Sequence, residues 1–350
     1  MTTASAPGKL MLTGEYAVID GAPSIMIAVD RRAVARRNAV PRGSSPFLLA
    51  VATEIAERRG AASPEARAAM EITVDSSAFY DEPMRRIPAS MAIGRAITRD
   101  FAPGAVPSAA PERQKLGLGS SAAVTVAATA LALGTADRHA VLEVAQAAHA
   151  RAQGPLGARG SGADIAAAVY GGTIIFSRPG GGDRPCQVEP RRWPSQVTLL
   201  AFFTGASADT AQLVAKVHAA REAQRAAVEG ALHAITQASL AACAALSAPG
   251  DLAAIALIGA LALAAAATDR LAAATGLPLV PGCVTAARAE LARIGGVAKT
   301  TGAGGGDVGI AVIPATADPA VAHRMLVDAG CQPLDMLRDE AGVEVRPASS

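Results

Sequence analysis

The chain has 350 residues, of which 51% are hydrophobic and 18% charged, and its formal net charge at pH 7 is +2. This length allows two domains, and the apolar share allows a large core. The near-neutral charge and the absence of dense Lys/Arg runs argue against a general nucleic-acid binder. Only 3% of the residues are aromatic, so a core rich in alanine must bring helices close to their neighbours.

The strands are predicted from apolar and β-branched runs bounded by turn residues. The first two flank a turn at Asp20-Gly21 and should form a hairpin. Strands are expected twice within residues 10–30, at 71–75, at 171–178, at 196–205, and on both sides of a glycine-rich loop within 297–314.

The helices are predicted from helical spacing and end signals. The clearest spans residues 120–133, with serine at its start and Gly134 just past its end. Others are expected at 47–59, at 89–99, at 136–153, in a short stretch opened by Asp164, in two or three Ala-rich segments over 209–275, and at 318–329. Residues 102–111 predict an irregular loop. The mixture, without a fixed-period repeat, indicates an α+β fold.

The cysteines, the N-terminus and one apolar run favour a cytoplasmic protein without a membrane partner. The four cysteines form no CxxC pair or zinc spacing, which predicts reduced thiols. The N-terminal MTTASAPGKL lacks the basic segment and apolar core of a signal peptide. The uncharged run between Asp251 and Asp269 falls just short of a typical membrane span and is mostly alanine, so we predict a buried helix.

The segment KLGLGSSAAVTVAA, residues 115–128, allows two interpretations as a phosphate-binding loop. Gly117-x-Gly119-x-x-Ala122 fits a dinucleotide-binding fingerprint, and Asp137 lies at the distance of its acidic residue. However, the preceding PSAAPERQ cannot form the buried strand that this fingerprint requires. The dinucleotide site is therefore the weaker interpretation.

The alternative for the same segment is a loop that holds the phosphates of a kinase substrate. Its glycines let the backbone approach an anion, and Ser120 and Ser121 add hydroxyls at a helix N-terminus. Lys115 adds a positive charge at the entry, and a hydroxyl here can also ligate Mg²⁺. A capped helix after a flexible loop remains the purely structural alternative.

Two further loops have a similar character. TTGAGGGD at residues 300–307 places five small residues in a row between two strands, where consecutive N–H groups could bind an anion. SAPGKL at residues 5–10 carries Lys9 into a strand and is followed by Gly14-Glu15-Tyr16.

The three loops, SAPGKLMLTGEYAV, KLGLGSSAAVTVA and KTTGAGGGDVGIAV, resemble in order and position the three motifs of the GHMP kinase superfamily. The resemblance covers nearly the whole chain. It implies an N-terminal half like ribosomal protein S5 domain 2 and a ferredoxin-like C-terminal half, with ATP and Mg²⁺ between them. We expect the N-terminal domain to span residues 1–185 and the C-terminal domain residues 186–350.

Within the superfamily the details most resemble the phosphomevalonate kinases. Lys115 directly precedes the second motif, and Asp307 stands where mevalonate kinases usually continue with another glycine. The passage GARGSGADIAAAVYGG at 157–172 is also similar. This implies ATP-dependent phosphorylation of phosphomevalonate to its diphosphate, in the mevalonate route to isoprenoids. The alternatives are mevalonate kinase or another GHMP small-molecule kinase and, less favoured, a non-catalytic binding protein or a dehydrogenase.

The resemblance also implies a set of site residues. The expected catalytic residues are Lys9, Lys115 and Asp164. The expected ATP-binding residues are Lys115, Gly117, Leu118, Gly119, Ser120, Ser121 and Ala122, with Ser121 also a Mg²⁺ ligand. The expected substrate-binding residues are Lys9, Glu15, Tyr16, Arg159, Ser161, Gly162, Ser207, Thr210, Gly302, Ala303, Gly304 and Asp307.

The expected acceptor makes the role of Asp164 a specific question. In relatives that phosphorylate an alcohol, the matching aspartate is proposed as a base. A phosphate monoester has its second pKa near 6 and is mostly ionised at neutral pH, so its oxygen needs no base. We therefore expect Asp164 to position Lys9 or the acceptor. The expected partner of the protein is a small-molecule substrate, and the expected oligomeric state is a monomer or a homodimer.

Overall fold

The N-terminal hairpin lies at the centre of a six-stranded antiparallel sheet. The computed structural model of the protein describes residues 2–37, 45–81, 114–154, 160–181 and 184–347. In this sheet the strand order is β12-β1-β2-β6-β7, and β3 also pairs with β2. The strands are β1 (Thr3–Thr13), β2 (Ser24–Arg37), β3 (Ile72–Asp75), β6 (Thr173–Ser177), β7 (Gln187–Arg191) and β12 (Glu344–Arg346). A short 3₁₀ helix, η1 (Ala17–Asp20), joins β1 to β2.

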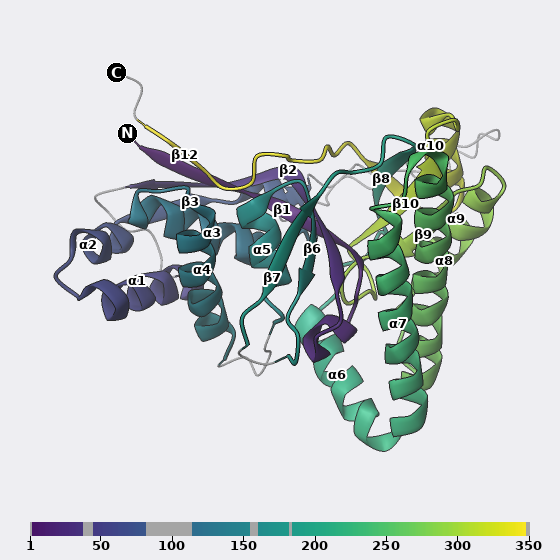
Figure 1. The fold of residues 1–350 in the computed structure, drawn as a ribbon, viewed down its shortest axis with the longest axis horizontal. Helices are drawn as coiled ribbons and strands as arrows, with labels where there is room; N and C mark the ends of the chain where they lie inside the picture. Colours follow the sequence, from purple (N-terminus) through teal and green to yellow (C-terminus); the bar gives the residue numbers. More distant parts are fainter. Residues whose placement is uncertain (1, 38–44, 82–113, 155–159, 182–183, 348–350) are drawn as a thin grey trace, which may run out of the picture.

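Among the described residues, five helices form a layer on one face of this sheet, on the left of the view in Figure 1. The central one, α3, packs against β1 and β2 and against α1 and α4. Nearly all of its side chains are buried, most of them alanine, which allows the close packing expected from the composition. The helices are α1 (Pro46–Arg59), α2 (Pro64–Met70), α3 (Ser120–Leu133), α4 (Arg138–Gln153) and α5 (Ala163–Tyr170).

A four-stranded antiparallel sheet and further helices form the other side of the molecule (Figure 1). Its strand order is β11-β8-β10-β9, with β8 (Val197–Phe203), β9 (Val297–Thr300), β10 (Val308–Pro314) and β11 (Gln332–Leu334). The helices are α6 (Thr210–Ala223), α7 (Arg225–Ala245), α8 (Gly250–Thr275), α9 (Gly282–Ala292) and α10 (Pro319–Asp328). A 3₁₀ turn, η2 (Ser77–Phe79), leads to a two-stranded ribbon of β4 (Tyr80–Asp81) and β5 (Gln114–Lys115).

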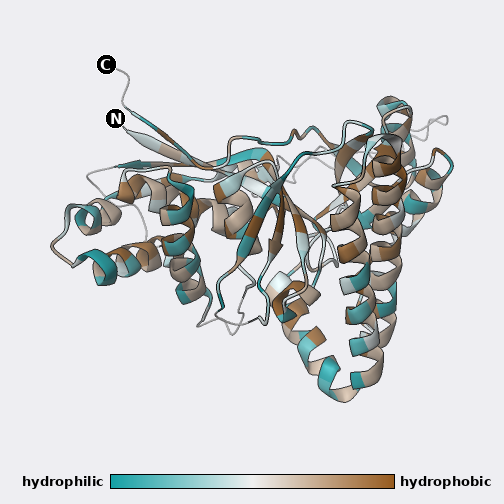
Figure 2. Ribbon diagram, viewed as in Figure 1, coloured by the Kyte–Doolittle hydropathy of each residue, from teal (hydrophilic) through white to brown (hydrophobic). Residues whose placement is uncertain are grey.

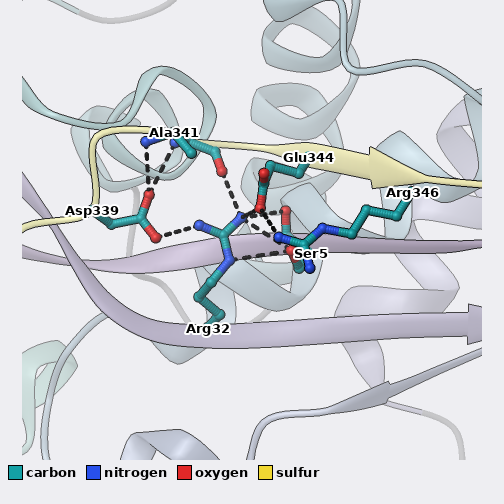
Figure 3. A network of polar contacts seen from close by, with 7 residues as sticks. Ser5, Arg32, Asp339, Ala341, Glu344 and Arg346 are labelled. Carbon is teal, nitrogen blue, oxygen red and sulfur yellow. Dashed lines mark hydrogen bonds and ion pairs between the residues drawn. The ribbon is translucent and has the colours of Figure 1, made fainter.

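The C-terminal strand returns to the first sheet and is fixed there by Arg32 (Figure 3). The Arg32 guanidinium donates to the carbonyl oxygens of Ser5, at 3.1 Å, and Gly342, at 2.7 Å. It also forms ion pairs with Asp339 and Glu344. Since Arg32 lies on β2 and Ser5 on β1, this network joins the last segment of the chain to the first two strands.

The α+β class is confirmed, and so are the N-terminal hairpin and the helix over residues 120–133. Helices α2 and α9 and the short strands β4, β5, β7, β11 and β12 were not predicted. The helix expected at 89–99 and the loop expected at 102–111 lie outside the described residues. The division between residues 185 and 186 stays a prediction, and both β7 and β12, beyond that point, pair within the first sheet.

All four cysteines are free thiols, as predicted. Among the described helices, α8 is long and apolar enough to cross a membrane by length and composition, over Leu252–Thr275. Half of its most apolar window is buried inside the protein. The prediction of a buried helix therefore holds for one side of α8, and its other side is exposed.

Candidate functional site

Residues from all three glycine-rich segments line one cavity of about 530 Å³: Lys9 from the first, Gly117 and Gly119 from the second, and Asp307 from the third. The cavity lies between the two sheets, because its walls come from β1, the N-termini of α3, α5 and α6, and the loop before β10. The predicted site residues that line it are Lys9, Lys115, Gly117, Gly119, Ser120, Ser121, Asp164, Ser207, Thr210 and Asp307.

The loop before α3 has the geometry of an anion-binding turn. Gly117 and Gly119 adopt the left-handed region, with φ of 71° and 75°, which few other residues tolerate. No described side chain caps the N-terminus of α3, so the N–H groups of its first turn are available to an anion. Leu118 and Ala122 are fully buried, so their side chains anchor the loop in the core and only their backbones could contact ATP.

Lys9 is held against this loop by its backbone and its side chain. The Lys9 N–H donates to the Leu118 carbonyl at 2.9 Å. A Cβ atom added to Gly119 would lie only 2.9 Å from Cε of Lys9, so the aliphatic stem crosses directly over that glycine. Burial lowers the pKa of the Lys9 ammonium, and the negative charges of Asp164 and Asp307 oppose this shift. The loop therefore needs a glycine here to admit a partly desolvated cation.

Asp307 joins the third loop to the segment before α6. Its backbone has a φ of 55°, unusual for a residue other than glycine. Its N–H donates to the Ala206 carbonyl at 2.7 Å, and its own carbonyl accepts from Thr204 N at 3.0 Å and Thr204 Oγ1 at 2.9 Å. Its carboxylate accepts from Ala208 N at 3.2 Å.

The Asp307 carboxylate also lies directly against the phosphate loop. A Cβ atom added to Gly117 would lie 2.3 Å from Oδ2 of Asp307. Burial raises the pKa of the Asp307 carboxyl, while its bond to Ala208 and the charges of Lys9 and Lys115 lower it. One carboxylate thus lies between two lysines at the place where phosphates are expected.

Glu15 and Tyr16, predicted to bind substrate, are joined to the third loop by an ion pair and a hydrogen bond. Glu15 is fully buried in an ion pair with Lys299 of β9, and Lys299 also donates to the Thr300 carbonyl at 2.7 Å. Tyr16 Oη donates to the Ala303 carbonyl at 2.6 Å. Neither Glu15 nor Tyr16 lines the 530 Å³ cavity. The ion pair commits the Glu15 carboxylate to Lys299, which argues against a substrate contact by Glu15. Tyr16 lines a second cavity of about 470 Å³ that shares Ile19, Ala211 and Val214 with the first, so a substrate contact by Tyr16 stays a prediction.

Comparison with known proteins shows which family part of this chain resembles and which fold it has. Residues 104–172 match the family model of the GHMP kinases N terminal domain. The chain has the GHMP kinase fold. The structure of Streptococcus pneumoniae phosphomevalonate kinase in complex with phosphomevalonate and AMPPNP is similar to that of this chain, with a TM-score of 0.70 and 16% identity. The match covers 97% of this chain and 100% of that one. The Lin0012 protein from Listeria innocua has a TM-score of 0.73 and 20% identity, covering 99% of both chains.

In sequence, the chain is similar to a known enzyme over most of its length. The phosphomevalonate kinase of Streptomyces sp. (strain CL190) is 29% identical over 351 residues, which covers 91% of each chain. The resemblance and the fold expected from the three motifs are thereby confirmed.

Several predicted site residues lie near this cavity without lining it. Ser161 Oγ accepts from Ala163 N at 3.2 Å, and Gly162 adopts φ of 83° at the start of α5, where it packs against Gln146. Gly302, Ala303 and Gly304 do not line the cavity. The Tyr16 hydroxyl donates to the carbonyl of Ala303. Arg159 lies outside the described residues.

The cavity also has lining residues that were not predicted. They are Ile19, Gln153, Gly160, Ala208, Asp209, Ala211 and Val214. The Asp209 carboxylate caps α6 by accepting from Gln212 N at 3.0 Å, a capping signal that the sequence carries. Asp137, the acidic residue of the dinucleotide interpretation, caps α4 by accepting from Ala140 N at 2.8 Å. Because this carboxylate caps a helix, Asp137 does not support the dinucleotide interpretation.

Proposed function

We propose that this chain transfers the γ-phosphoryl group of ATP to phosphomevalonate, forming the diphosphate and ADP. The observation that carries the proposal is the convergence of Lys9 and Lys115, from separate segments, on the cavity at the uncapped N-terminus of α3. The similarity to the Streptomyces phosphomevalonate kinase supports this acceptor.

The proposed reaction joins two anions, so its main obstacle is electrostatic repulsion. An oxygen of the acceptor phosphate attacks the γ-phosphorus, the bond from that phosphorus to the β,γ-bridging oxygen breaks, and ADP leaves with the electron pair. The acceptor is mostly ionised near neutral pH and brings its own nucleophile. Lys9, Lys115 and the N–H groups of the loop then act by neutralising charge and aligning the two phosphates.

The residues present fit a Mg²⁺ ion that arrives on the nucleotide. Among the described residues no group of three or more His, Cys, Asp and Glu could hold a metal, which argues against a cage built by the protein alone. The Ser121 hydroxyl lines the cavity, 3.3 Å from Nε2 of His149. Ser121 would hold the ion together with the ATP phosphates, and the ion would offset the charge of those phosphates.

A direct test compares two acceptors in one assay. ADP release is coupled to a spectrophotometric readout, with mevalonate and phosphomevalonate at equal concentrations. We expect turnover with phosphomevalonate and at least about a hundredfold lower kcat/KM with mevalonate, because an acceptor without a phosphate leaves the cations of the cavity unpaired. Equal or faster turnover of mevalonate would replace the proposal with mevalonate kinase. Failure of ATP to raise the melting temperature would argue against any kinase.

Asp164→Asn tests whether this carboxylate acts as a base or as a positioning group. Asp164 lines the cavity, and its charge acts on Lys9. A general base contributes about 10²–10⁴-fold to rate, so we expect a smaller loss in kcat, below about a hundredfold, with an unshifted acidic limb in the pH–rate profile. Complete loss of turnover with intact substrate binding, measured by calorimetry, would show that Asp164 is the base.

Asp307→Asn tests the charge of the carboxylate between the two lysines. Asparagine keeps the acceptor for Ala208 N but removes the negative charge. We expect ATP to bind about three- to tenfold more tightly by calorimetry, because one of the two carboxylates that compete with the phosphates for the lysines is then removed. Asp318→Asn, at the cap of α10 and outside the cavity, serves as the matched control. Unchanged or weaker ATP binding with intact folding would contradict this charge balance.

A further inference from the structure

Helix α8 exposes an apolar strip that no other described part of the chain covers. Three of its large side chains are more than 60% exposed: Leu252 at 63%, Ile255 at 71% and Leu263 at 61%. Ala256, Gly259, Ala262 and Ala266 are exposed on the same side. At about 100° per residue, all seven lie within about 60° of the direction of Gly259. Hydrophobic colours run along both α7 and α8 in Figure 2.

The strip has an internal symmetry about Gly259. Leu252 and Ala266 stand seven residues from Gly259 on either side, Ile255 and Leu263 four residues, and Ala256 and Ala262 three residues. An antiparallel copy of α8 crossing at Gly259 would therefore place Leu252 against Ala266 and Ile255 against Leu263. Large residues would meet small or matching ones, as interdigitated packing requires.

We propose that this strip is the contact surface between two copies of the chain, packed as antiparallel α8 helices about a two-fold axis at Gly259. A two-fold contact uses the same patch on both subunits, and the exposed positions of the strip are spaced symmetrically about Gly259. A Cβ atom added to Gly259 would meet nothing within 4 Å in the single chain. The glycine therefore serves no packing need within the subunit, and it allows two helix backbones to approach closely.

The charges at the ends of the strip fit the same pairing. Residues 252–268 carry no charged side chain, and the next exposed residue on the strip is Arg270. Arg270 has no hydrogen-bond or ion-pair partner among the described residues. It stands eleven residues beyond Gly259 and would lie opposite Ala248 of the other copy, next to the C-terminus of α7. A helix C-terminus favours a cation.

The lack of other basic residues on the strip argues against a membrane surface as its occupant, because membrane-bound helices usually carry several Lys or Arg residues. The strip from Leu252 to Arg270 is about 27 Å long and one helix wide. This is at the small end for a specific interface, so we expect a reversible dimer whose population depends on concentration.

Sedimentation equilibrium over a hundredfold concentration range tests the proposal. We expect the wild-type chain of 34.9 kDa to shift from monomer to dimer. Gly259→Leu should weaken dimerisation at least about tenfold, because the added side chain separates the helices at their crossing point. The same change should preserve the monomer, since leucine favours a helix more than glycine does. Gly230→Leu is the matched control, because Gly230 of α7 is also helical, exposed and open.

Two further experiments distinguish a second copy of the chain from a membrane as the partner of the strip. Gly259→Cys should cross-link as a dimer with a short bis-maleimide, whereas Gly230→Cys and the wild type should not. A wild-type chain that stays monomeric throughout the range would overturn the proposal. So would binding to phosphatidylcholine vesicles containing one quarter phosphatidylglycerol that Gly259→Leu preserves, because a membrane tolerates an added leucine.

Discussion

Lys9→Met is expected to lower kcat by about 10²–10³-fold while the protein stays folded. Methionine keeps an unbranched apolar stem over Gly119 but removes the cation from the cavity. Preorganised charges aimed at a transferring phosphoryl group contribute effects of this size because they act where water is largely excluded. The measurement is kcat and KM by coupled ADP release, with the melting temperature as a check on folding.

The pH dependence gives this prediction a second readout. Burial lowers the pKa of Lys9, so its charge is lost at a lower pH than that of an exposed lysine. The wild-type rate should therefore fall on the alkaline side as Lys9 loses its proton, and this limb should be missing from the residual activity of Lys9→Met.

Lys216→Met is the matched control, since Lys216 is exposed on α6 and outside the cavity. A loss of less than about tenfold for Lys9→Met would remove Lys9 from the catalytic residues, because charged groups at such sites contribute more.

The sequence predicted the parts of the site that depend on local signals. The limits of α3, the glycine-rich turn before it and the position of Lys9 at a strand follow from patterns within a few residues. The same holds for Asp164 at the start of α5. These features meet in one cavity because β1 and α3 pack directly against each other, and the order of the three motifs already implied this.

What the sequence did not predict depends on contacts between distant segments. The role of Glu15 is set by Lys299, which reaches it only after β9 is placed in the second sheet. One signal was present: the chain has only four lysines, at positions 9, 115, 216 and 299, although it has 32 basic residues. A lysine within the apolar strand VAKT requires a buried partner, and Glu15 supplies it.

Lys299→Met is expected to destabilise the protein by about 3–5 kcal/mol, because it leaves the fully buried Glu15 carboxylate without its partner. The free energy of unfolding is measured by urea titration at pH 7. The double change Glu15→Gln with Lys299→Met removes both charges and should recover most of this loss. Lys216→Met should stay within about 0.5 kcal/mol of the wild type, as exposed positions usually do.

The loss caused by Lys299→Met should also shrink as the pH falls. Burial raises the pKa of Glu15, and Lys299 opposes that shift. Without Lys299 the folded pKa rises further above the unfolded value, so the folded state binds a proton that the unfolded state does not. Stability then increases as the pH falls toward the unfolded pKa. A pH-independent loss, or a double variant less stable than Lys299→Met, would show that Lys299 supports the third loop by packing rather than by its charge.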